Sequence, residues 1–384
     1  MATVSDNIGR QARGLETEGY LIVIEGEFGL SGGLGSGTMD LVVGGGLETY
    51  KSDKVSHADN YNVQFNIRVP WTATGYVEGS GRSQEGTEEP KLTDINQTRV
   101  RTRRSTVGLA AGRDVTPTFK WSTGVNTITE SRFDRELTES RVDLNWDRAL
   151  SRSTSLAFEG SFNQGTEDIA GDSWTGSYFT LDKTKRIGSL SLLGFRIEWE
   201  NLRLKKDDGT KELSDVVSFV ARYVEETRSG WTYTSELGMD GIRPIVDERL
   251  WEPRAEISLS SRRERRVQFN SSLSTSSSLQ DPVDQLEQEI AWTRESQFRA
   301  GLKWSLNRTF VIEPLVRYFR AELFSNTAAD AVNRTLAFQV GTRWSISRIW
   351  SLDTAAVSEI VEGSDPANDL AEKSLRLTLS GQFF

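Results

Sequence analysis

The sequence predicts an all-β chain that forms a transmembrane antiparallel β-barrel, and three observations lead to this fold class. Apolar and polar residues alternate strictly in many segments, such as "YNVQFNIRV", which starts at Tyr61. Tight turns alternate with longer, acidic connections between these segments. Tryptophans gather beside the tight turns, as on either side of "SISRI" near the C-terminus. A transmembrane barrel explains all three, because its strands alternate lipid-facing and lumen-facing residues between short turns and long loops.

The composition is compatible with membrane strands and excludes a bundle of membrane helices. Only 36% of the 384 residues are hydrophobic, and the net charge is -9. The chain contains no run of about 18 apolar residues, the minimum for a membrane helix. Cysteine is absent, which excludes disulfides, thiolate metal sites and acylated cysteine anchors. The opening "MATVSDNIGRQARG" has no signal-peptide pattern, so we expect the numbering to begin at a mature or engineered start.

The turns and connections predict the number of strands. About nine long connections imply about eighteen strands, an even number that leaves both chain ends on the side of the short turns. The expected first strand is "TMDLVVGGGLETYK" and the expected last strand is "EKSLRLTLSGQFF". The tight turns lie near Pro70, Asp114, Ser151, Gly188, Ser229, Arg263, Asn307 and Ser347.

Residues 1–34 are expected to form a periplasmic or lumen-entering extension, and residues 35–384 the transmembrane barrel. The segment "YLIVIEGEFGL", from Tyr20, has the character of a strand. One further strand would make the number odd and separate the two chain ends, so we assign this segment to the extension. Short turns are expected on the periplasmic side and acidic loops on the extracellular side.

Tryptophan side chains are expected to form girdles at the membrane surfaces, because an indole joins a large apolar body to one hydrogen-bond donor. The alternative is a soluble β-sandwich with tryptophans in its core, which would need several domains, although no linker separates any. A second girdle near the long loops is expected to include Tyr61, Trp174, Trp251 and Trp292. The girdle beside the turns consists of Trp71, Trp121, Trp146, Trp231, Trp304, Trp344 and Trp350.

The chain ends in a pattern that resembles the last-strand signal of outer-membrane barrels. The segment "LRLTLSGQFF" finishes with Phe383 and Phe384. Its leucines are in phase with Phe383, whereas the usual signal is in phase with the final aromatic residue, here Phe384; a β-bulge would restore the phase. We expect the outer-membrane assembly machinery to bind these two residues.

Charged residues on the lumen face are the candidates for transport selectivity. Arginines and carboxylates alternate on the polar face of several strands, as in "RVDLNWD" and "RIEWEN". Lumen charges select among permeating solutes. The alternative is a solvated network of salt bridges that stiffens the wall. The candidates are Arg141, Asp143, Arg196, Glu198, Glu200, Arg222, Arg254, Glu256 and Arg299.

No catalytic site, cofactor or metal site is expected, and the chain is not expected to be an enzyme. The single histidine, His57, lies in a polar loop. It provides neither a histidine cluster for zinc nor a plausible Ser/His pair. Nucleic acid is not an expected partner, because the chain is acidic and has no basic groove lined with aromatic residues.

The lipid bilayer and lipopolysaccharide are the expected partners of the outer surface. Arg99, Arg101 and Arg103 are in phase with Val107 and Leu109, which are expected to face lipid. Arginine binds phosphate through two parallel hydrogen bonds, so these side chains suit lipopolysaccharide phosphates. The alternative is an ordinary charged base of a loop.

The turn segments "DRALSRSTSLAF", "SLNRTFVI" and "SISRIWSL" resemble those of outer-membrane β-barrels found with exopolysaccharide synthesis and export systems in Gram-negative bacteria. The resemblance covers most of residues 36–384. It implies a porin-like exit for a secreted polysaccharide, which works with periplasmic export proteins in the bacterial outer membrane. It implies no individual site residue.

Two other functions remain open from the sequence. A general or substrate-selective diffusion porin would carry a long constriction loop, and the longest loop expected here is only about 15 residues. A scaffold barrel would surround a partner protein. The chain has no haem-binding CxxCH motif, so any redox centre of such an assembly would belong to the partner.

Overall fold

A computed structural model describes residues 2–5, 19–50, 58–88, 100–132, 135–168, 171–243, 249–261, 266–279, 290–325, 331–363 and 369–381. The described chain is all-β, as predicted, and none of its segments is a helix able to span a membrane. The strands are β1 (Ala2–Ser5), β2 (Gly19–Leu34), β3 (Gly37–Tyr50), β4 (Ala58–Thr72), β5 (Gly75–Glu88), β6 (Val100–Thr116), β7 (Phe119–Arg132), β8 (Arg135–Ala149), β9 (Thr154–Glu167), β10 (Ser173–Arg186), β11 (Ser191–Lys205), β12 (Lys211–Glu226), β13 (Trp231–Arg243), β14 (Leu250–Ser261), β15 (Val267–Leu279), β16 (Ile290–Ser305), β17 (Phe310–Ser325), β18 (Ala331–Ser345), β19 (Trp350–Glu362) and β20 (Leu370–Gly381).

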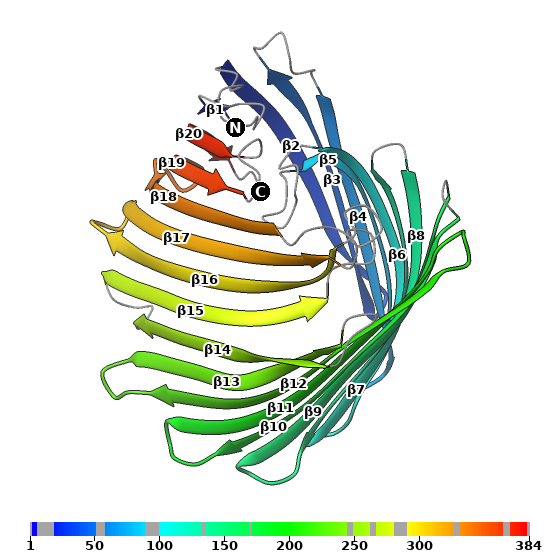
Figure 1. Ribbon diagram of the computed structural model, residues 1–384. Helices are drawn as coiled ribbons and strands as arrows, with labels where there is room; N and C mark the ends of the chain where they lie inside the picture. The colour runs from blue at the N-terminus through cyan, green and yellow to red at the C-terminus, as the bar shows by residue number, and fades with distance from the viewer. Residues whose placement is uncertain are drawn as a thin grey trace.

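All strands belong to one antiparallel sheet that curls into a barrel (Figure 1). From β2 to β20, each strand pairs with the strand that follows it in the chain. The short strand β1 pairs with both β2 and β20, so the circuit of strand pairing is closed. This architecture confirms the predicted antiparallel barrel.

The number of strands differs from the expected value, because the chain before residue 35 contributes two strands. Gly19–Leu34 is β2 and pairs along its full length with β3. Strands β2 and β20 run in the same direction, so they could not pair antiparallel with each other. β1 lies between them and restores the alternation. Within the residues that the structure describes, the sheet therefore has 20 strands, and the parity argument against "YLIVIEGEFGL" was wrong because it did not include β1.

The two ends of the barrel differ in their connections. We call the end that holds the turn between β2 and β3 the turn side, and the opposite end the loop side. Most loop-side connections are longer than the turns, as expected, but residues 133–134 alone separate β7 from β8. This connection is therefore as short as the turns on the other side.

The outward face of the sheet is apolar and the inward face is polar. On β11, for example, Phe195 and Ile197 are exposed on the outside, whereas Arg196 and Glu198 form ion pairs in the lumen. Aromatic rings also contact each other across neighbouring strands on the outside, where Phe179 stacks on Trp199 at 5.4 Å between ring centroids. The local alternation of the sequence predicts which face each of these side chains occupies.

All seven tryptophans of the predicted turn-side girdle lie toward the turn-side ends of their strands. The indoles of Trp71, Trp304 and Trp344 are 55%, 45% and 47% exposed. Trp121 and Trp146 are directly opposite each other on β7 and β8. The placement suits an interfacial girdle, whose contact with lipid stays a prediction.

Phe383, Phe384 and the predicted arginines Arg99 and Arg101 lie outside the side chains that the structure describes, whereas Arg103 is exposed.

An arginine placed on the outward face should destabilise the barrel. Phe298 faces outward near the middle of β16 and is 39% exposed. The Phe298→Arg variant should lose about 2–4 kcal/mol of unfolding free energy in bilayers, because its charge would meet hydrocarbon. Leu302→Arg, nearer the turn, should lose less. Urea titration of liposome-embedded protein measures both, and Arg299→Ala on the lumen face is the control, expected to be mild. Equal losses at Phe298 and Arg299 would contradict this assignment of faces.

The pairing of neighbouring strands is interrupted between β14 and β15. Their ladder joins residues 255–260 only to residues 270–275, although both strands continue to pair with their other neighbours. Beyond this ladder, β15 contacts β12 and β13. The carboxylate Oδ2 of Asp240 on β13 accepts a hydrogen bond of 2.8 Å from the backbone N–H of Ser277. The loop-side half of β15 therefore lies inside the barrel, behind β13.

The wall overlaps itself at this interruption. We call the loop-side ends of β10–β14 the outer layer and those of β15–β17 the inner layer. Leu279 and Trp292 are in phase with outward-facing residues of β15 and β16, yet they are only 7% and 5% exposed. The Trp292 ring stacks on Phe324 at 3.8 Å between centroids. The apolar core consists of Leu137, Trp174, Leu202, Leu204, Val216, Ile242, Leu279 and Trp292.

This core changes the expected shape of the lumen. A round barrel of this many strands would enclose a wide aqueous channel. Here residues of β8 and β16, far apart in the strand order, belong to one buried cluster, so the two walls meet. We call the part of the barrel in which the two layers overlap the sector. Apolar side chains close the lumen on the loop side of this sector. The prediction that Trp174 and Trp292 belong to a second membrane girdle was wrong, because both rings are buried between the layers.

Candidate transport site in the lumen

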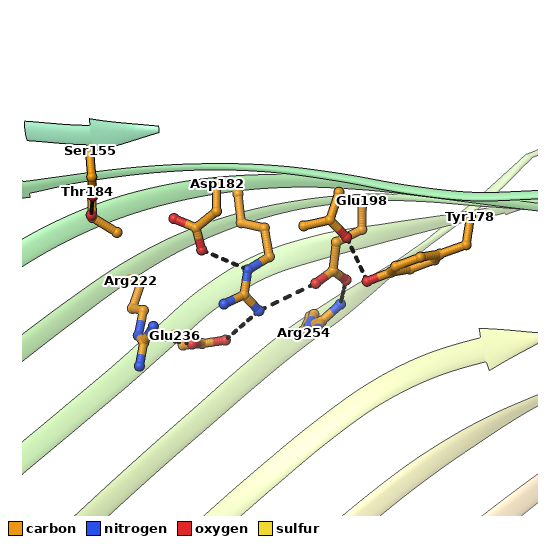
Figure 2. Close-up of polar contacts among 10 residues, drawn as sticks. Ser155, Tyr178, Asp182, Thr184, Glu198, Arg222, Glu236 and Arg254 are labelled. Carbon is orange, nitrogen blue, oxygen red and sulfur yellow. Dashed lines mark hydrogen bonds and ion pairs between the residues drawn. The ribbon is translucent and has the colours of Figure 1, made fainter. Parts of the chain in front are cut away.

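An ion-pair network crosses neighbouring strands of the lumen wall from β10 to β14 (Figure 2). Arg196 on β11 lies at its centre, with Nε 3.0 Å from Oδ2 of Asp182 and Nη1 3.3 Å from Oε1 of Glu198. On the following strands, Nε of Arg222 lies 3.2 Å from Oε1 of Glu236. The other oxygen of Glu236 lies 3.9 Å from Arg196. Acidic and basic side chains therefore lie next to each other along this part of the lumen wall.

Arg254 on β14 extends the network toward the overlap. Its Nη1 lies 2.5 Å from Oε2 of Glu198 and 3.6 Å from Oδ1 of Asp240. The side chain of Asp240 is fully buried, at 0% exposure, and that of Arg254 is 21% exposed. A buried carboxylate is costly unless a cation and hydrogen-bond donors compensate it. Arg254 and the N–H of Ser277 provide both, so the network also supports the inner layer.

The network holds a small excess of negative charge. Its members are three arginines and four carboxylates, formally one more acid than base. On its β10 edge, the hydroxyl of Thr180 donates to the hydroxyl of Tyr178 at 2.5 Å, which Figure 2 shows beside Glu198. The wall therefore offers hydrogen-bonding groups as well as fixed charge to a solute.

A lumen cavity of about 740 Å³ adjoins the network on the turn side. The guanidinium of Arg68 lies 3.6 Å above the ring of Tyr76, one of the lining residues, and so orients it. Amide, hydroxyl, carboxylate and aromatic groups together suit a polyhydroxylated or otherwise hydrophilic ligand better than an apolar one. The lining includes Tyr76, Asn145, Glu159, Tyr178, Asp182 and Glu198.

A second lumen cavity, of about 600 Å³, holds another predicted pair. Nε of Arg141 lies 2.7 Å from Oδ1 of Asp143, and Nδ2 of Asn126 donates to Oδ2 of Asp143 at 3.2 Å. Arg82 and Arg104 also line this cavity. The predicted partners Arg141 and Asp143 therefore do lie together, but apart from the larger network.

The remaining candidates lie at other positions of the lumen wall. Glu200 is on β11, next to Tyr178 and Val216 in the strand register. Glu256 is exposed on β14 and directly opposite Glu236. Arg299 is exposed on β16, opposite Arg317. The structure thus gathers Arg196, Glu198, Arg222 and Arg254, and a role in selectivity remains a prediction for all of the candidates.

Several members of the site were missed by the sequence analysis. Asp182, Glu236 and Asp240 supply most of the acids of the network. Glu236 and Asp240 alternate in "ELGMD" and could have been identified by phase. The sequence also held a signal for the overlap. Leu202 and Leu204 are in phase with the lumen-facing charged residues of β11 but are apolar. That break in the pattern marks the buried core.

Among the side chains that the structure describes, no group of three or more His, Cys, Asp or Glu residues is placed to hold a metal ion. The acids of the network are instead interleaved with arginines, whose charges would repel a cation. The arrangement can bind and orient a polar solute through hydrogen bonds and charge.

The sequence matches no protein-family model and no curated protein. Its fold is similar to those of solved outer-membrane transporters and receptors. For the FrpB iron transporter from Neisseria meningitidis (F3-3 variant), the TM-score is 0.67 at 10% identity, over 100% of this chain and 80% of that chain. For the siderophore receptor PirA from Pseudomonas aeruginosa, the TM-score is 0.54 at 9% identity, over 90% of this chain and 80% of that chain.

The alcaligin outer membrane receptor FauA from Bordetella pertussis gives a TM-score of 0.53 at 9% identity, over 98% of this chain and 75% of that chain. At these identities the similarity establishes the fold alone. This chain has the barrel architecture of such proteins.

Proposed function

We propose that the chain is a β-barrel of the bacterial outer membrane that passes a hydrophilic cargo through its lumen. The observation that carries the proposal is the lumen wall itself, where a charged network adjoins a cavity of about 740 Å³ lined by both polar and apolar groups. An apolar outward face around a polar interior is the arrangement that a membrane-spanning conduit needs. The barrel fold shared with known transporters supports the same function.

The cargo we propose is a secreted polysaccharide. Hydroxyl, amide and carboxylate groups of the cavity, such as Asn145 and Glu159, suit sugar hydroxyls. Five of the residues that line the cavity are aromatic, Tyr76 and Tyr178 among them, and their rings can also contact the faces of sugar rings. In this proposal the turn side faces the periplasm and receives cargo from export proteins, while the outward face contacts lipid and lipopolysaccharide.

A second candidate is uptake of a metal chelate. The similar structures are described as transporters or receptors for iron, siderophores and copper. A chelate carries its own metal ligands, so the lumen wall would need only to bind a polar complex. A scaffold barrel around a partner protein is the third possibility.

Single-channel conductance in planar bilayers tests the conduit and ranks the cargo. We expect dextrans of graded length to reduce the current when they are added on the turn side. Addition on the loop side should reduce the current less, because the overlap narrows that end of the barrel. Block by a ferric chelate but not by dextran would favour chelate uptake. A folded barrel with no conductance would contradict the conduit and favour the scaffold.

A further inference from the structure

We infer that the overlap between the outer and inner layers is a binding site for the acyl chain of a membrane amphiphile, entered from the bilayer between β14 and β15. This site lies in the barrel wall, apart from the lumen cavity of about 740 Å³, and goes beyond the proposed passage of hydrophilic cargo.

The entrance is the unpaired part of the seam. The ladder between β14 and β15 ends at Ala255 and Thr275, so residues 250–254 form an edge that no described strand pairs on the β15 side. Pro253 lies within this edge, where a residue without a backbone N–H is tolerated. Two layers held by side chains can separate without breaking a hydrogen-bonded ladder.

The interior of the overlap is apolar toward the loop side, beyond the polar contact between the buried Asp240 and Ser277. Ile242 of the outer layer and Leu279 and Trp292 of the inner layer are buried in one cluster. These side chains exclude water, and the hydrophobic effect favours an apolar occupant in their place. A flexible acyl chain can fill the space left when the Trp292 ring moves away from Phe324. A hydrated polysaccharide cannot.

The two ends of the overlap differ in polarity, and this difference selects an amphiphile. At the outer mouth, Met239 and Trp251 are exposed on the outward face at 41% and 50%, continuous with the apolar surface that meets lipid. At the inner end, Arg254 and the buried Asp240 begin the charged network. An acyl chain would lie between the layers while its polar headgroup meets the lumen charges.

One ion pair clasps the layers together. Oε2 of Glu252 on β14 lies 3.0 Å from Nη1 of Arg294 on β16, so the contact reaches past β15. The outer layer has its own support, since Asp215 of β12 pairs with Arg243 at 2.7 Å and also with Arg249. Loss of the clasp should therefore loosen the overlap without unfolding the outer layer.

Photolabelling with a lipid tests the site. The full-length protein is placed in vesicles of phosphatidylcholine that contain a diazirine group in the acyl chain, irradiated and mapped by mass spectrometry. We expect label on Leu279 and Trp292 as well as on outward residues. Glu252→Gln, which removes the clasp, should raise labelling of the overlap about fivefold, equivalent to roughly 1 kcal/mol of lost contact between the layers.

Glu130→Gln is the matched control. Glu130 lies near the same end of the barrel and pairs with Arg104 at 3.9 Å across an uninterrupted ladder, so this variant should leave the labelling unchanged. Label confined to outward residues such as Phe298 in all three proteins would overturn the proposal. Conductance is not read in this experiment, so failure of the lipid site is distinguishable from failure of the proposed conduit.

Paired cysteines test the entrance separately, because the chain contains no native cysteine. Ala255→Cys/Thr275→Cys lies on the last ladder pair and should oxidise to a disulfide. Pro253→Cys/Ser277→Cys, two residues farther on each strand, should remain reduced under the same treatment. If the second pair oxidises as readily as the first, the strands are paired there and the entrance does not exist.

Discussion

The Arg254→Met variant is expected to lose about 3–5 kcal/mol of unfolding free energy, the loss typical of a buried ion pair that loses one partner. Arg254 is the cation nearest to the fully buried Asp240, at 3.6 Å, and it also contacts Glu198 at 2.5 Å. Methionine has a similar length but no charge. Without the arginine, the buried Asp240 would lack its cation, and Glu198 would lose one of the two arginines that it contacts.

Urea titration of the protein in detergent micelles measures this loss, with Arg343→Met as the control. Arg343 pairs with Asp353 at 2.6 Å, but their side chains are 58% and 33% exposed. An exposed pair contributes about 0–1 kcal/mol, so the control should be nearly neutral. Equal losses in the two variants would contradict the structural role of the network.

A second substitution should rescue part of the loss. In Arg254→Met/Asp240→Asn the buried charge of residue 240 is absent, while an amide oxygen can still accept the hydrogen bond from Ser277. The double variant should therefore be more stable than Arg254→Met alone. If it is less stable, the damage comes from lost packing of the arginine stem and not from the unpaired charge.

The Trp292→Ala variant is expected to lose a comparable amount, about 3–5 kcal/mol, and to conduct more current than the native protein. Trp292 is 5% exposed and stacks on Phe324, in the core between the layers. Its removal leaves a cavity where the two layers meet. Because this core closes the loop side of the sector, a looser overlap should raise single-channel conductance.

Trp304→Ala is the matched control for this prediction. Trp304 lies on the same strand but is 45% exposed on the outward face near the turn side. Its loss should cost less stability and leave the conductance unchanged. If Trp304→Ala raises the current as much as Trp292→Ala, the increase is not caused by opening of the overlap.

The alternation of residues was sufficient to predict much of this fold. Arg196 and Glu198 face the lumen while Phe195 and Ile197 face outward, as the sequence predicts. This prediction succeeds because neighbouring side chains of any strand point to opposite faces, whatever the strand pairs with. The tight turns are equally local, and the strands begin and end close to them.

Two features depended on contacts between distant parts of the chain. β1 is only 4 residues long, too short for a periodic pattern, and its role follows from the parallel directions of β2 and β20. Likewise, the charged partners of Arg196 include Asp182 and Glu236 from two other strands, β10 and β13, besides Glu198 on its own strand. Phase identifies a lumen residue, but the register of the strands decides which charges meet.

The sequence by itself determined that the chain is a barrel with an apolar exterior, a charged interior and tryptophans beside its turns, since these follow from local period and turn chemistry. Only the tertiary structure decided that the wall overlaps itself and buries Trp174 and Trp292 between its layers. The alternating pattern of β16 is the same whether its outward face meets lipid or the inner surface of β13. Both surroundings are apolar, so the sequence cannot distinguish them, and the missing ladder beyond Ala255 does.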